Sequence, residues 1–382
     1  MSRKVCVVVN SRANYGRIKT VLAAIKKHPD LELQLIVGAS ALLHRFGNVI
    51  DIIRKDGFEP NAVIYSIVEG ENLTTMAKST GLAIQELTSQ FENLKPDVAL
   101  TVADRFETMA TAITASYMNI PLAHTQGGEV TGSIDESVRH AITKLAHIHF
   151  PATKKAAENI IRMGEDPASV FITGCPAIDI CKTCSRELTA DLFAKYKGVG
   201  PGLDPMKPYM VVLQHPVTTE FGEGFQQINE TLEAVRNIDI QIVWLWPNVD
   251  AGSDDISKGL RMFREEHNPD NMHFFRNFSP EDYVRLIGNC KCLVGNSSSG
   301  IREGAWLGTP DVTIGTRQSG RECAENVIHV HYDRNEIEKA VRFQLDHGRY
   351  ASDHLYGDGC TDERIADILA TASFNINKKL CY

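Results

Sequence analysis

The chain has 382 residues and a formal net charge of −8 at pH 7, with 43% hydrophobic and 23% charged residues. This composition is typical of a soluble globular protein, and the acidic balance without a basic run argues against a nucleic-acid partner. The N-terminal apolar run is too short for a signal peptide, and no apolar stretch reaches the roughly 18 residues of a membrane helix. We therefore expect a cytoplasmic chain of two domains, with no membrane partner.

The first half of the chain alternates short apolar runs with amphipathic segments. Strands are predicted at 4–10, 33–38, 62–68, 96–102, 120–124 and 148–151, and helices at 18–25, 73–91, 108–117 and 134–145. Alternation of this kind is the signature of a doubly wound parallel sheet.

The pattern repeats after a break. The segment 196–208 contains three glycines and three prolines and is interpreted as a connector. Further strands are predicted at 209–214, 241–245, 273–275, 292–294, 312–314 and 327–330. The sequence thus predicts an α/β fold of two Rossmann-like domains with a cleft between them, where the carboxyl ends of both sets of strands meet.

One stretch, CLVGNSSSGIREGAWLGTP at 292–310, combines a strand, a turn of small residues and a helix start. Free backbone N–H groups and the helix dipole make such a turn suitable for an anion. Ser298, Ser299 and Gly300 are candidate phosphate contacts, and Glu303 is placed to reach a ribose hydroxyl. The alternative is an ordinary serine-capped helix.

Other polar residues also follow predicted strands, which favours a single site built from both halves. Arg12 could face a diphosphate, and His215 precedes a proline at the cleft mouth. Asp104 is either a helix cap or a catalytic acid or base. Asn248 lies in the turn after a tryptophan-rich strand, and the loop containing Phe278 could hold a nucleobase through backbone contacts.

Two carboxylates follow the strand at 120–124. Glu129 comes after two glycines, which allow close approach of the backbone to a ligand. Glu136 completes the capping-box pattern S-x-x-E that begins at Ser133, so it could serve only to cap the helix. By their spacing, Glu136, Arg139 and His140 share one helical face, as a polar wall of the site or as a local ion-pair network.

Cofactor signals are weak throughout. No G-x-G-x-x-G follows the first strand, so no nicotinamide or flavin cofactor is predicted. The histidine pairs at 147/149 and 329/331 and the single C-x-x-C at 181–184 lack further ligands nearby, so no metal is predicted. The nine cysteines are scattered, which favours free thiols.

Several motifs together resemble one known family, the UDP-N-acetylglucosamine 2-epimerases, in their hydrolysing branch. They are NSRANYGR, TVADRFET, HTQGGEVTGSIDESVRHAITKLAHIHFPAT, WPNVDAGS, VGNSSSGIREGAWLGTP and GTRQSGRE. They run from residue 10 to residue 322 in the family's order, and the long block at 124–153 is the most specific.

The resemblance implies a fold like that of GT-B glycosyltransferases, with domains at 1–180 and 181–359 and a C-terminal helix at about 360–382 packing back on the first. It implies conversion of UDP-N-acetylglucosamine to UDP and free N-acetylmannosamine for sialic acid synthesis. In that reaction a base removes the C2 proton, UDP leaves to give a glycal, water adds at C1, and C2 is reprotonated from the opposite face. No cofactor is needed.

The resemblance also implies roles for particular residues. The family's catalytic carboxylates fall on Asp104, Glu129 and Glu136, with Asp135 as an alternate. His215 matches the cleft histidine that could stabilise the leaving diphosphate. The substrate-binding positions are Arg12, Ser298, Ser299, Gly300, Glu303 and, less closely, Arg321.

The resemblance leaves alternatives open. Asn14 stands where relatives often have Asp, and the sugar identity is not fixed. Some relatives act on UDP- or GDP-linked 2,4-diacetamido-trideoxy sugars of the legionaminate path. A non-hydrolysing epimerase or a GT-B glycosyltransferase would use a similar nucleotide domain. The family also suggests a dimer or tetramer built through the first domain.

Overall fold

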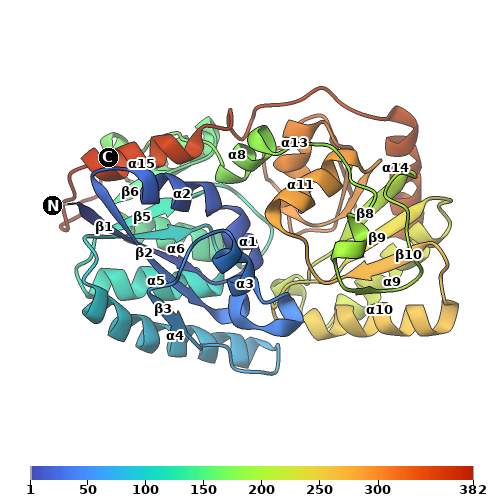
Figure 1. Ribbon diagram of the computed structural model, residues 1–382, viewed down its shortest axis with the longest axis horizontal. Coiled ribbons are helices and arrows are strands. Elements are labelled where there is room, and N and C mark those ends of the chain that lie inside the picture. The colour runs from blue at the N-terminus through green and yellow to red at the C-terminus, as the bar shows by residue number, and fades with distance from the viewer. Residues whose placement is uncertain (1, 382) are drawn as a thin grey trace.

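The computed structural model describes residues 2–381 and has two lobes, each built on one sheet (Figure 1). The first sheet has six parallel strands in the order β3-β2-β1-β4-β5-β6. In chain order these are β1 (Arg3–Val9), β2 (Leu31–Gly38), β3 (Ala62–Ile64), β4 (Val98–Val102), β5 (Leu122–Thr125) and β6 (Ile148–Phe150).

The second sheet has seven strands in the order β13-β12-β11-β8-β9-β10-β7, and all pair in parallel except β7. They are β7 (Gly198–Val199), β8 (Tyr209–Leu213), β9 (Gln241–Leu245), β10 (Met272–Phe275), β11 (Leu293–Gly295), β12 (Asp311–Ile314) and β13 (Val327–Val330). The short β7 lies within the predicted connector, which is therefore not wholly irregular.

Helices cover both faces of each sheet. In the first half of the chain they are α1 (Arg12–Gly16), α2 (Lys19–Lys27), α3 (Val49–Lys55), α4 (Leu73–Leu94), α5 (Phe106–Tyr117), α6 (Asp135–Leu145), α7 (Lys154–Arg162) and α8 (Pro176–Thr183). Those that follow are α9 (Gly224–Arg236), α10 (Ser253–His267), α11 (Pro280–Asn289), α12 (Ser298–Ile301), α13 (Glu303–Leu307), α14 (Arg334–His347) and α15 (Thr361–Thr371). Short 3₁₀ turns occupy 39–42, 44–46, 167–169, 193–195 and 218–220. No helix within residues 2–381 is both long and apolar enough to cross a membrane.

The side chains of β1 alternate between two apolar cores, one on each face of the first sheet. In β1, Val5, Val7 and Val9 face one apolar core, whereas Cys6 and Val8 face another. Successive strand residues point to opposite faces, and a parallel sheet covered on both faces needs apolar residues at every position. This is why the run VCVVV is continuous rather than alternating.

Both sheets have the same strand order, 3-2-1-4-5-6, counted from the first parallel strand of each. The order reverses between β1 and β4 in the first sheet and between β8 and β11 in the second. Ligands of open α/β sheets bind at such switch points. The predicted fold class is thereby confirmed, and the two switch points face one another across the interdomain cleft.

Helix α15 belongs to the first lobe although it is the last helix of the chain. Its residues Ile365, Ala366 and Leu369 are buried in the core that contains β1 and α2. Figure 1 shows the chain returning from the second lobe to place α15 beside α2. The chain therefore passes between the lobes twice.

Candidate active site

A cleft of about 440 Å³ lies between the two lobes and is lined by residues of both. The first lobe supplies segments that follow β1 to β5, and the second supplies segments that follow β8 to β12. A cavity of this size is typical of a small-molecule site. Its two ends differ in chemistry.

The serine-rich turn forms one end. Ser297 caps α12, with its Oγ accepting the Ser299 N–H, and Ser297, Ser298 and Ser299 all line the cleft. The Ser298 Oγ accepts a hydrogen bond of 2.5 Å from Arg17 Nη2 of the first lobe, while Tyr283 Oη lies 2.6 Å from Ser299 Oγ. Hydroxyl and backbone N–H groups thus converge beside a cation, as an anion site requires.

Gly300 does not line this cleft. A Cβ at Gly300 would lie 1.8 Å from Asp311 Oδ1, so the glycine allows α12 to pack closely on β12. The predicted single helix is also divided into α12 and α13 at Arg302. Glu303, the first residue of α13, does line the cleft, and burial raises the pKa of its carboxyl.

Arginines of the first lobe line the same end. Arg12 donates to the Arg276 carbonyl at 2.9 Å and to Asn277 Oδ1 at 3.3 Å. Among the described residues neither Arg12 nor Arg17 has a carboxylate partner, so both keep a charge for an anionic ligand. Sequence reasoning assigned no role to Arg17. Arg17 directly follows the short helix α1, which begins at Arg12, and this nearness to Arg12 could have suggested a role in anion binding.

His215 and Asn248 lie together on the second lobe. The Asn248 N–H donates to His215 Nδ1 at 3.2 Å, which places the proton of the neutral imidazole on Nε2. Burial, then the charges of Arg317 and Arg12, lower the pKa of His215 well below its usual value. The ring is therefore a neutral hydrogen-bond donor in the cleft.

Phe278 lines the cleft near the connector. It is buried, and its ring packs 4.5 Å from that of Tyr196 and 5.1 Å from that of Phe275. Its backbone N–H bonds to the side chain of Asn277. Of these three aromatic residues only Phe278 lines the cleft, and the other two support it from behind.

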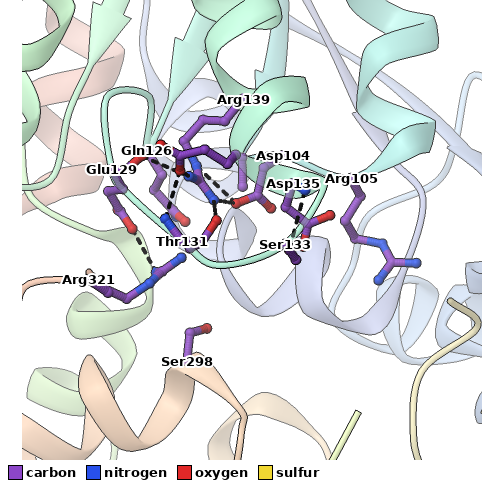
Figure 2. Close-up of polar contacts among 12 residues, drawn as sticks. Asp104, Arg105, Gln126, Glu129, Thr131, Ser133, Asp135, Arg139, Ser298 and Arg321 are labelled. Atoms are coloured by element: carbon purple, nitrogen blue, oxygen red, sulfur yellow. Dashed lines mark hydrogen bonds and ion pairs between the residues drawn. The ribbon is translucent and has the colours of Figure 1, made fainter. Parts of the chain in front are cut away.

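Asp104 lies at the opposite end, after β4. It does not cap α5, because the cap position falls on Arg105. Instead its Oδ2 accepts from both Nε and Nη2 of Arg139, a fully buried side chain (Figure 2). Burial alone would raise the pKa of Asp104, but the charges of Arg139, Arg17 and Arg321 outweigh it and hold the pKa far below its usual range.

Asp135 also lines the cleft, as do the carboxylates of Asp104, Glu303, Glu71 and Asp254. Burial, reinforced by the charge of Asp104, raises the pKa of Asp135 to about 6. Its nearest cation is Arg317, at 3.7 Å. Two cleft carboxylates with pKa values pushed in opposite directions are the usual arrangement for acid–base chemistry.

Glu129 lies behind the wall of the cleft and not on its lining. Its Oε2 accepts from Arg302 Nη2 at 2.5 Å and from Arg321 Nη1 at 2.7 Å. Arg321 itself lines the cleft. Burial works against the charge, but the two arginines lower the pKa of Glu129.

Glu136 also lies off the cleft lining, and the capping box that was its alternative role does not form. Helix α6 begins at Asp135, and Glu136 Oε2 accepts the N–H of Thr131, not that of Ser133. The same oxygen bonds to Arg139, and Oε1 lies 2.8 Å from His140 Nε2. Of the two interpretations of this helical face, the local ion-pair network is correct.

Two of the histidines considered as possible metal ligands each lie beside a carboxylate. His149 lies 3.1 Å from Glu165, and His331 lies 3.0 Å from Glu336. All nine cysteines are free thiols, as expected, and burial raises the pKa of Cys181 well above its usual value. A raised pKa disfavours the thiolate of Cys181, which is the reactive form of a cysteine.

Comparison with known proteins identifies a family for this chain. A family model described as UDP-N-acetylglucosamine 2-epimerase matches residues 23–370. The chain is 33% identical to the UDP-N,N'-diacetylbacillosamine 2-epimerase (hydrolyzing) of Legionella pneumophila, covering 97% of this chain and 96% of the relative. It is 30% identical to the UDP-N-acetylglucosamine 2-epimerase of Neisseria meningitidis serogroup B, covering 97% and 95%.

The fold is shared with solved structures at lower identity. The Methanocaldococcus jannaschii UDP-GlcNAc 2-epimerase, solved in complex with UDP-GlcNAc and UDP, has a TM-score of 0.82 at 17% identity. The alignment covers 97% of this chain and all of that one. From the family match, the full-length relatives and the fold, we conclude that this chain belongs to the UDP-N-acetylglucosamine 2-epimerase family.

Proposed function

We propose that the protein is a hydrolysing 2-epimerase that converts UDP-N-acetylglucosamine and water to UDP and N-acetylmannosamine. The observation that carries this proposal is the division of one cleft into a cationic, serine-lined end and an end with two carboxylates of opposite pKa shift. A nucleoside diphosphate suits the first end, and the acetamido sugar then lies against the second.

The proton at C2 of the sugar is weakly acidic, so its removal needs a positioned base. Asp135 suits this role because a carboxylate with a pKa near 6 is a stronger base than an ordinary aspartate, yet is ionised at neutral pH. Asp104, held ionised by Arg139, is too weak a base and serves to fix the geometry and field around the reacting carbons.

Departure of UDP from C1 requires stabilisation of the developing charge on the diphosphate. Arg12, Arg17 and the hydroxyl of Ser298 lie at that end, and His215 donates from Nε2. A neutral donor and fixed cations stabilise the leaving oxygen without taking up the C2 proton. Elimination of the C2 proton and UDP leaves a glycal with a C1–C2 double bond.

Water then adds to C1, and a proton returns to C2 from the opposite face. The net change is cleavage of the C1–O bond by water with inversion at C2, so atoms balance without an oxidant or reductant. The product N-acetylmannosamine is a precursor for sialic acid synthesis.

A second substrate deserves a parallel test, because the Legionella relative is named for a UDP-linked diacetylbacillosamine. That sugar is a 2,4-diacetamido-trideoxy hexose, and the same C2 chemistry applies to it. The Neisseria relative is named for UDP-N-acetylglucosamine and is almost as similar, so the two sugars need direct comparison.

The deciding experiment is incubation with each sugar nucleotide in D2O. We expect free UDP together with the 2-epimeric sugar carrying deuterium at C2. Product still linked to UDP would indicate a non-hydrolysing epimerase. Transfer of the sugar to an added acceptor, without deuterium at C2, would indicate a glycosyltransferase and overturn the proposal.

A further inference from the structure

Glu129 makes a buried ion-pair cluster that joins the two lobes. It lies in the loop after β5 of the first lobe, whereas Arg302 and Arg321 belong to the second. The three side chains are at most 4% exposed, and of the three residues only Arg321 lines the cleft. Figure 2 shows Glu129 turned toward Arg321 and away from Asp104.

The cluster depends on the two lobes being together. Within residues 2–381 Glu129 Oε1 has no hydrogen-bond partner, and the carboxylate is held through Oε2 by the two arginines. Removal of one member of a buried ion pair leaves an uncompensated charge, which is costly. Without the Glu129 carboxylate, closure of the lobes would bury two guanidinium groups of like charge close to one another.

Each end of the cluster is bonded to one end of the cleft. Arg302 joins α12 to α13, the helices that carry Ser298 and Glu303. On the other side, the Glu129 carbonyl accepts from Arg139 Nη1 at 2.8 Å, and the same guanidinium holds Asp104. A continuous set of buried polar contacts thus runs from the phosphate end to the carboxylate end.

We propose that Glu129 is a positioning residue that clamps the second lobe onto the first through Arg302 and Arg321, and so sets the spacing between the phosphate-binding serines and the acid–base carboxylates. The role in catalysis rests on the proposed function, whereas the clamp between lobes does not. It differs from the catalytic role that the family resemblance implied for Glu129.

A proton-transfer role for Glu129 fits the geometry less well. Glu129 lies off the cleft lining, and the two arginines that bind its Oε2 lower the pKa of the carboxyl. Geometry and charge therefore favour a carboxylate that stays ionised and paired throughout turnover.

The first test is Glu129→Gln, with KM and kcat measured separately. Binding energy then has to close the lobes against the repulsion of the two arginines, so KM should rise on the order of tenfold. Because Asp104 and Asp135 are untouched, kcat should change by no more than about threefold, and each product molecule should still carry deuterium at C2. A fall in kcat of about a hundredfold or more at unchanged KM would show proton transfer and overturn the clamp.

The second measurement is small-angle X-ray scattering of the full chain at saturating UDP. Glu129→Gln should show a larger radius of gyration than the wild type. A matched control is Glu165→Gln, which removes another buried carboxylate with cation partners, all of them in the first lobe or the tail packed on it. The control should lower the melting temperature but leave KM and the radius of gyration unchanged.

A double-mutant cycle distinguishes the loss of the clamp from a general loss of stability. If Glu129 and Arg302 act as one clamp, the variant Glu129→Gln/Arg302→Met should have a KM no higher than Glu129→Gln alone, because the uncompensated charge is also removed. Additive effects on KM would contradict the proposal. If the wild type turns over neither sugar nucleotide but the scattering difference persists, the proposed function fails while the clamp stands.

Discussion

The two ends of the cleft differ in how their charged groups are partnered. At the phosphate end Arg12 and Arg17 bond to neutral groups, namely a carbonyl, an amide oxygen and the Ser298 hydroxyl. At the other end Asp104 is bound directly by an arginine, while Asp135 has its nearest cation 3.7 Å away.

These partners suit different tasks. Neutral partners orient the arginines without cancelling their charge, so a diphosphate meets cations that are already positioned. The unequal partners of the two carboxylates separate their pKa values, so one can exchange a proton while the other stays fixed. Under the proposed function, we expect the phosphate end to control affinity and the carboxylate end to control the rate of the chemical step.

The largest effect is expected for Asp135→Asn, which tests whether the carboxylate end sets the rate without affecting affinity. Loss of the base should lower kcat by about 10²–10⁴-fold and abolish deuterium incorporation, while the affinity for UDP stays near that of the wild type. A kcat within tenfold of the wild type would remove Asp135 from the mechanism. Ionising Asp135 costs folding free energy above its ordinary pKa, so the variant should melt no lower than the wild type at pH 8.

The pH dependence of kcat/KM tests the role of Asp135 at the same end of the cleft. A raised pKa means that Asp135 keeps its proton up to about pH 6, so the basic form is lost as the pH falls below that value. We expect kcat/KM to be level above pH 6 and to fall about tenfold per pH unit below it. A rise in kcat/KM toward low pH would instead make Asp135 the acid.

Gly300→Ala should perturb the phosphate end indirectly, through the packing of α12 on β12. The added Cβ would lie 1.8 Å from Asp311 Oδ1, so either α12 or the Asp311 side chain must shift. Overpacking of this kind costs about 1–3 kcal/mol of stability, and displaced serines should weaken UDP binding on the order of tenfold in a calorimetric titration. Gly81→Ala is the control, because nothing lies within 4 Å of its added Cβ.

The smallest effect is expected for Ser298→Ala. It removes one hydroxyl from the phosphate end and the acceptor for Arg17, so UDP affinity should fall by about 1 kcal/mol, or roughly fivefold. The fraction of product deuterated at C2 should not change. Ser116→Ala on α5, whose hydroxyl bonds only within its own helix, should leave UDP affinity unaltered.

The fold was largely predictable because parallel strands buried on both faces produce continuous apolar runs. The strands at 241–245 and 327–330 match their predicted bounds, and others differ by a few residues at their ends. The antiparallel β7 was missed, since two residues in a glycine-rich segment carry no periodicity. The break at Arg302 was missed because it depends on contacts with the other lobe.

The site was predictable in its composition but not in the direction of its side chains. Polar residues at the carboxyl ends of strands do converge on one cleft, as Asp104, His215 and Ser298 show. Glu129 and Glu136 were grouped with them, yet neither residue lines the cleft. Glu129 is held by two arginines that are distant in sequence, so neither spacing nor residue type encodes its direction. Glu136 is held instead by the Thr131 N–H and by Arg139, one turn further along its own helix.

The return of the chain to the first lobe has a consequence for how the protein is made. The core around β1 is completed by Ile365 and Leu369 of α15, which emerge from the ribosome only after the whole second lobe. Domains otherwise tend to fold in order from the N-terminus during synthesis. Here the lobe that is synthesised first cannot finish its core until the lobe synthesised second is already outside the ribosome.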